Sequence, residues 1–170
     1  IALSGDEINL REEWKDALFE IMAAGGGNTA AGLANAERAL KLLKNMKKTA
    51  ADEEYEKAAK LAEANEHAGN NAEEEDDTIE ARAEAQFREW RKSVMRLILS
   101  WHRDILLLVC GGTKDLLFNK AHADFLANAA KNVTRSKALR NLRIVEDMHR
   151  RVEGNLPDGP VLNYGFSRLA

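Results

Sequence analysis

The strongest constraint on the fold is the stretch from Phe87 to Cys110, which predicts one long amphipathic helix. Its last six residues, Ile105 to Cys110, are all apolar, and Gly111 and Gly112 follow them as a helix stop. Starting near Thr78, such a helix would be about 50 Å long. The side chains at helical spacing are Phe87, Trp90, Val94, Leu97, Ile98, Trp101 and Ile105. We expect the last third to be the buried end, because it is apolar on almost every side.

The rest of the chain also favours helices. Only 2 prolines and 11 glycines interrupt a sequence rich in Ala, Leu, Glu, Lys and Arg. We therefore predict a single all-α domain over residues 1–170, a bundle of about five to seven helices with one long central helix. The other expected helices are 4–24 with a Ser4/Glu7 capping box, 28–48, a weaker one over 49–68, one after Asn119 as N-cap, 134–154 and a short one over 161–169.

Charge is distributed unevenly along the chain. Residues 51–77 hold 11 acidic and 2 basic side chains, whereas residues 78–170 hold 10 acidic and 16 basic ones. We interpret residues 49–77 as an acidic, partly disordered insertion, whose 69–77 part has no apolar period and is typical of a solvated loop. The alternative for this loop is a site for a cation or a basic partner.

The composition indicates a protein of the cytoplasm. There is no apolar run long enough to span a membrane and no signal-peptide pattern at the start. The single cysteine, Cys110, excludes an internal disulfide, and we expect it to be a small buried hydrophobe at the end of its helix.

No set of residues can be given catalytic roles, so we predict neither an enzyme nor a bound cofactor or metal. The four histidines, His67, His102, His122 and His149, lack the spacing of a metal-binding helix. The glycine triplet at 25–27 is not followed by the Gly-Lys-Ser/Thr of a phosphate-binding loop. The three tryptophans, Trp14, Trp90 and Trp101, fall on apolar faces and are expected in the core.

Two groups of polar residues are candidates for contacts. Arg103 and Asp104 precede the apolar run, where they would satisfy a neighbouring helix end or each other, or form an ion pair at a subunit interface. The second group is basic and lies on the predicted 134–154 helix, where Arg140, Arg143 and Arg150 share one side. This stripe is a solvated face, a protein interface or a contact for DNA phosphates. Its full set is Arg135, Lys137, Arg140, Arg143, Arg150 and Arg151.

The order of several features resembles the C-terminal collar domain of the delta-prime subunit of the bacterial DNA polymerase III clamp loader, or of the related tau/gamma subunit. These features are Trp101, the Arg103-Asp104 pair with its apolar run, the Leu116-Leu117-Phe118-Asn119 connector, and the helix with Leu139, Leu142, Val145 and Met148 that leads to Asn155. The resemblance covers residues 87–156 and, more loosely, 10–48. The acidic segment of residues 52–77 departs from the family and resembles an insertion.

The resemblance implies a non-catalytic module that joins the other loader subunits into a ring during sliding-clamp loading, with DNA contacted only indirectly. It also implies an ATPase-like module upstream, and neither a membrane nor a small-molecule partner. The residues expected at subunit interfaces are Trp101, Arg103, Asp104, Arg140, Arg143, Arg150 and Asn155. The alternative is a stand-alone helical adaptor or nucleic-acid-binding domain that uses the basic helix over residues 135–151.

Overall fold

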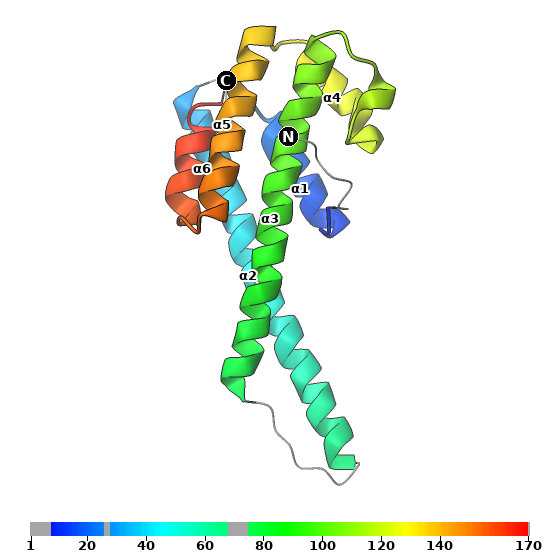
Figure 1. Ribbon diagram of the computed structural model, residues 1–170, viewed down its shortest axis with the longest axis vertical. Coiled ribbons are helices and arrows are strands. Elements are labelled where there is room, and N and C mark those ends of the chain that lie inside the picture. The colour runs from blue at the N-terminus through cyan, green and yellow to red at the C-terminus, as the bar shows by residue number, and fades with distance from the viewer. Residues whose placement is uncertain (1–7, 26–27, 68–74, 170) are drawn as a thin grey trace. The chain divides into compact units, whose positions relative to one another are not determined.

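The computed structural model describes residues 8–25, 28–67 and 75–169, and all regular structure in these ranges is helical (Figure 1). This confirms the all-α prediction. The α-helices are α1 (Glu12–Ala23), α2 (Thr29–His67), α3 (Asp76–Val109), α4 (Ala123–Ala130), α5 (Arg135–Glu153) and α6 (Asp158–Phe166), and two 3-10 turns, η1 (Lys114–Leu116) and η2 (Lys120–His122), join α3 to α4.

The described chain divides into two compact units. The first unit comprises residues 1–40 and 92–170, and the second comprises residues 41–91. Both α2 and α3 contribute a segment to each unit, and the predicted acidic insertion belongs to the second.

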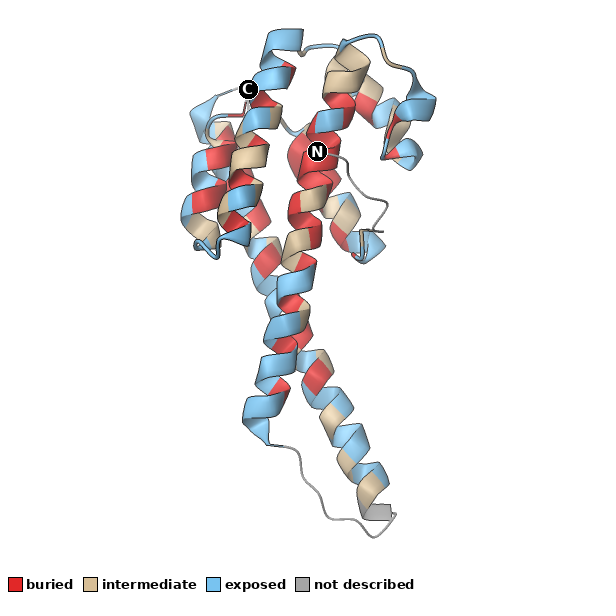
Figure 2. Ribbon diagram, in the orientation of Figure 1, coloured by how far each residue is buried: buried red, intermediate tan, exposed pale blue. Residues whose placement is uncertain are grey.

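The first unit has a full hydrophobic core between its helices. The periodic residues that the sequence predicted on α3 are buried there, including Val94, Leu97, Ile98, Trp101 and Ile105. Figure 2 shows the buried residues of α5 and α6 on the sides that face the neighbouring helices. Side chains that lose nearly all their exposure come from α1, α3, α4, α5 and α6, namely Leu18, Leu97, Ile98, Leu126, Val145, Met148 and Leu162.

Two glycines let α6 pack closely against other elements of the first unit. A Cβ at Gly165 of α6 would collide with the side chain of Met148 on α5. A Cβ at Gly32 of α2 would collide with the backbone of Phe166 at the end of α6. Both positions therefore require the absence of a side chain, and Gly165 has this role in addition to its low helix propensity.

The second unit is a hairpin in which residues 41–67 of α2 and 76–91 of α3 run antiparallel (Figure 1). Its buried apolar residues include Met46, Ala50, Ile79, Ala83 and Phe87, which form a narrow seam. Polar contacts across the hairpin supplement this seam. Arg82 donates to Glu54 at 2.9 Å, Gln86 donates to Glu53 at 2.7 Å, and Lys47 pairs with Glu84 at 2.8 Å.

Several helix ends lie where the sequence predicted them. The Oδ1 of Asn28 accepts from the backbone N of Ala31 at 2.9 Å and caps α2, and Thr134 caps α5 by accepting from the backbone N of Lys137 at 3.3 Å. Gly25 follows α1 with φ of 67° and Gly111 follows α3 with φ of 85°, so both adopt the left-handed conformation that favours glycine.

The predicted starts of three helices were wrong. Helix α1 begins only at Glu12, because residues 8–11 are not helical, and the Ser4/Glu7 capping box lies outside the described residues. Helix α3 begins at Asp76 rather than Thr78, which places Asp76 and Asp77 in its first turn, where the helix dipole favours carboxylates. Helix α6 begins at Asp158 rather than Val161.

The predicted division of residues 28–68 into two helices was also wrong. Helix α2 continues unbroken from Thr29 to His67, since no glycine or proline interrupts it between Leu33 and His67. The lysines at 41–48 therefore lie in the middle of a helix and not at its C-terminus. Residues 49–67 are ordered helix, whereas most of the predicted 69–77 loop lies outside the described residues.

The expected burial of the end of α3 was wrong in part. The deeply buried segment ends at Ile105, whereas Leu106, Leu107, Leu108 and Val109 are half-buried. Cys110, which we expected to be buried, is exposed. The four half-buried residues point in successive directions around the helix and each keeps part of its exposure, so the run is only partly covered on every side.

Candidate interaction sites

The carboxylate of Asp104 is a fully buried charged group in the first unit. Its Oδ1 accepts from the backbone N of Phe118 at 3.0 Å, and its Oδ2 accepts from both the backbone N and the Nδ2 of Asn119, each at 2.9 Å. Asn119 Nδ2 also donates to Ser100 Oγ at 3.1 Å. Asp104 on α3 thus fixes the connector that leads into η2.

Arg103 completes this arrangement at the surface. Its Nη1 lies 3.0 Å from Asp104 Oδ1, while the Arg103 side chain keeps 44% of its exposure. The prediction that this pair satisfies a neighbouring helix end or each other is confirmed. The prediction that the Asn119 side chain caps the following helix was wrong, because it donates towards α3 instead.

Trp101 lies in an aromatic cluster and not on the surface. Its ring centroid is 5.4 Å from that of Phe19 on α1 and 5.9 Å from that of Phe125 on α4, and the His122 ring stacks on Phe19 at 3.9 Å. Trp101, Trp14 and Trp90 are all buried, which confirms their expected place in the core. Trp101 and Asp104 therefore stabilise the first unit from its interior, and neither side chain is accessible to a partner.

Next to Trp101, the buried His102 lines a cavity of about 400 Å³ in the first unit. Its Nε2 has no hydrogen-bond partner among the described residues. Burial lowers the pKa of His102 from 6.5 to about 4, so the imidazole is neutral near pH 7. Lys137 is the only other ionisable side chain in the lining, which also contains Asn35, Asn128, Asn132 and Asn141. The periodicity of α3 gave no signal for this cavity.

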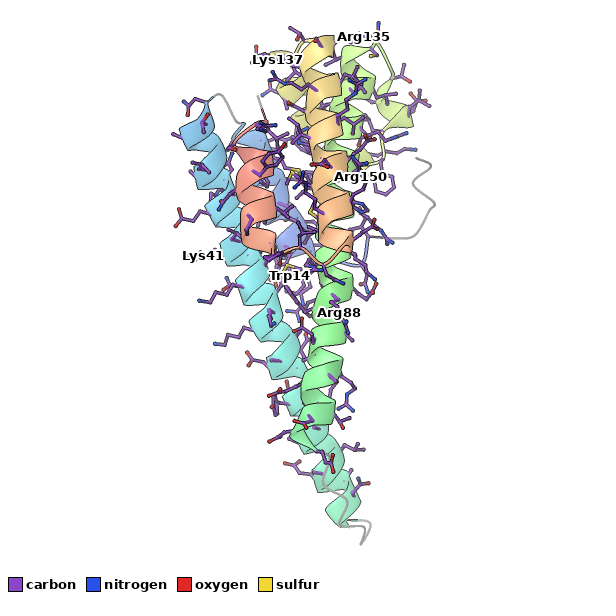
Figure 3. The ribbon with its side chains drawn as sticks, turned by 60° about the vertical axis from the view of Figure 1, so that its left-hand side comes forward. Trp14, Lys41, Arg88, Arg135, Lys137 and Arg150 are labelled. Atoms are coloured by element: carbon purple, nitrogen blue, oxygen red, sulfur yellow. The ribbon has the colours of Figure 1, made fainter. Side chains whose placement is uncertain are left out.

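The basic surface predicted on α5 is concentrated in the first half of that helix. Arg135, Lys137, Arg140 and Arg143 are exposed and have no ion-pair partner among the described residues. Further along α5, Arg150 and Arg151 pair with Asp147 at 3.5 and 2.7 Å. Figure 3 shows Arg135 and Arg150 near opposite ends of the helix. The predicted stripe therefore includes free cations at 140 and 143 and a partly neutralised one at 150.

Asn155 has a local role at the end of α5. It is exposed and adopts φ of 58°, a left-handed conformation that asparagine tolerates better than most side chains. The backbone N of Leu156 then donates to the carbonyl of Arg151 at 3.1 Å, which closes the helix end. The backbone conformation at the end of α5 is therefore sufficient to account for an asparagine at position 155, and no contact with another subunit is needed to explain it.

The described residues contain no group of three or more His, Cys, Asp or Glu side chains that could hold a metal ion. Within the same residues, no helix is both long and apolar enough to cross a membrane. Comparisons with known protein families, with curated proteins and with solved structures gave no match.

Proposed function

We propose that this chain is a non-catalytic assembly module, a collar-like domain that holds subunits of a bacterial DNA polymerase III clamp loader together during sliding-clamp loading. One observation carries the proposal. Two of the features on which the resemblance rests, the Arg103-Asp104 pair and Asn119, are far apart in the sequence and meet in one buried network. An ordered set of residues that is joined in this way is more specific than scattered matches would be.

The exposed surface supports a role in assembly. Beyond Asp104 and the core, the connector after α3 presents Leu116 and Phe118, which are 57% and 39% exposed, and α4 presents Phe125, which is 44% exposed. The half-buried residues 106–109 belong to the same part of the chain. Apolar side chains concentrated in one segment are typical of protein–protein contacts.

A reconstitution experiment tests the proposal. The chain is mixed with the delta and tau/gamma subunits from the same source, and the mixture is analysed by size-exclusion chromatography with light scattering. We expect a stoichiometric complex, which Leu116→Asp and Phe125→Asp weaken and the matched exposed change Leu61→Asp in the second unit does not. If the gene encodes no ATPase-like module before Ile1, or if no complex forms, the proposal is wrong.

The basic face of α5 favours a second function, direct binding of nucleic acid. Its four unpaired cations could contact phosphates, and such binding would weaken steeply with salt. Fluorescence anisotropy with single-stranded and primed DNA distinguishes the two functions. Binding by this chain alone, lost in the double variant Arg140→Glu/Arg143→Glu, would support the second function. A loader complex without DNA affinity would support the first.

A further inference from the structure

The second unit contains a groove of about 730 Å³ between its two helices. One wall consists of α2 residues from Lys44 to Tyr55, which extend over about 16 Å at the helical rise of about 1.5 Å per residue. The other wall consists of α3 residues from Asp77 to Glu84. Three of the ten lining residues are alanines, Ala51, Ala81 and Ala83, and most of the surface that the groove exposes is apolar.

Charge is separated along this groove. Lys44 and Lys48 lie at one end, and neither has an ion-pair partner among the described residues. Asp77 and Glu80 lie towards the other end, where burial, and with it the nearby charge of Glu80, raises the pKa of the Tyr55 phenol, and neither carboxylate has an ion-pair partner among the described residues. The one ion pair across the groove is Lys47–Glu84, among the described residues. The groove therefore has a basic end and an acidic end, both open to an external partner.

We propose that this groove binds a second copy of the same chain in antiparallel orientation. A two-fold rotation about an axis through the middle of the groove places the lysines of each copy against the carboxylates of the other. Such an interface is self-complementary, and its two ends make the same contacts. The parallel orientation would place like charges together and is disfavoured.

The centre of the groove provides the apolar contact that an ion-pair rim alone does not. Tyr55 is 41% exposed, and the alanines beside it leave room for a side chain from the second copy. In the antiparallel arrangement the phenol ring of Tyr55 approaches Lys44 or Lys48 of the other copy, where a cation–π contact adds to the attraction. Two hairpins joined in this way form a four-helix bundle, which buries more apolar surface than either hairpin alone.

Sedimentation equilibrium of the full chain tests this association. We expect the average mass to rise with concentration from 18.9 kDa towards twice that value, and to fall again at high salt because the end contacts are exposed. A chain that stays at the monomer mass at every concentration would overturn the proposal.

Charge exchange tests the orientation. Lys44→Glu/Lys48→Glu and Asp77→Lys/Glu80→Lys should each weaken self-association by about tenfold or more, because both ends become repulsive. An equimolar mixture of the two variants should associate again as a heterodimer. The control Lys120→Glu/Lys131→Glu changes the net charge as the first variant does and should self-associate like the wild type. Circular dichroism confirms folding, and a mixture that stays monomeric overturns the groove as the interface.

Discussion

Asn119 donates two hydrogen bonds to a single oxygen of Asp104, one from its backbone N and one from its Nδ2, both at 2.9 Å. The two residues are 15 positions apart in the sequence. Because the carboxylate has no exposure to solvent, it depends on these donors, on the backbone N of Phe118 and on the Arg103 guanidinium for its solvation. The contact thus stabilises a buried charge and fixes a connector at the same time.

Replacing Asp104 by alanine should destabilise the protein by about 3 kcal/mol, because three buried or half-buried N–H groups lose their acceptor. Urea unfolding followed by circular dichroism measures this change. Asp124→Ala is the control, since the Asp124 side chain is 94% exposed and pairs only with Lys114, and its effect should stay within about 0.5 kcal/mol. Equal effects of the two variants would contradict the importance of the network.

Gly165→Ala should destabilise the protein by about 1–3 kcal/mol, although alanine is the better helix former. The added methyl group collides with the Sδ, Cγ and Cε atoms of Met148, whose side chain is fully buried and would have to shift within the core. The control on the same helix is Asn163→Ala, which is exposed and should be neutral or slightly stabilising. Thermal unfolding of both variants measures the difference, and a stabilised Gly165→Ala would show that α6 packs less closely than described.

His102 should make stability depend on pH. Its pKa is lowered from 6.5 to about 4 in the folded state, so between these values the unfolded chain binds more protons. The contribution of His102 is therefore fully present above about pH 6.5 and is lost as the pH falls towards 4, a change of about 3 kcal/mol.

This dependence is measured as the free energy of unfolding in urea across that pH range. The variant His102→Gln should show a flatter profile than the wild type. Parallel profiles for wild type and His102→Gln would contradict the burial of a neutral imidazole.

Removing the cap of α5 by Thr134→Ala should cost about 0.5–2 kcal/mol, because the backbone N of Lys137 loses its side-chain acceptor. Ser136→Ala, two residues further on and equally exposed, removes a hydroxyl that makes no such contact and should be neutral. The difference between the free energies of unfolding of the two variants, measured by chemical denaturation, gives the contribution of the Thr134 cap. A loss of the same size in both variants would indicate a general effect of helix composition.

Sequence patterns predicted the helices and much of the core because these depend on local spacing. The spacing of Leu97, Ile98 and Trp101 correctly indicated the buried side of α3. Gly25 and Gly111 marked helix ends because glycine readily adopts the left-handed conformation. The sequence does not reveal the continuity of α2, because the apolar content drops at residue 49 as it would at a helix boundary. Nothing there interrupts the hydrogen bonds of the helix.

The candidate sites were less predictable because they depend on contacts between distant segments. The sequence places Asp104 directly before an apolar run. It does not show that the carboxylate of Asp104 accepts hydrogen bonds from Asn119, 15 positions later. Likewise, the exposure of Cys110 depends on where the bundle ends and not on the polarity of its neighbours. The lysines of α2 and the carboxylates of α3 that line the groove can be read from the sequence. Only the antiparallel pairing of the two helices shows that they lie at opposite ends of one groove.

The exposure of Cys110 has a practical consequence. It is the only cysteine of the chain, and a Cβ built at the adjacent Gly111 would meet no atom within 4 Å. A maleimide dye can therefore be attached at one defined position of the wild-type protein, without mutation and without displacing a packed side chain. Because this position directly follows α3, the rotational diffusion of the dye would report when a large molecule joins the first unit.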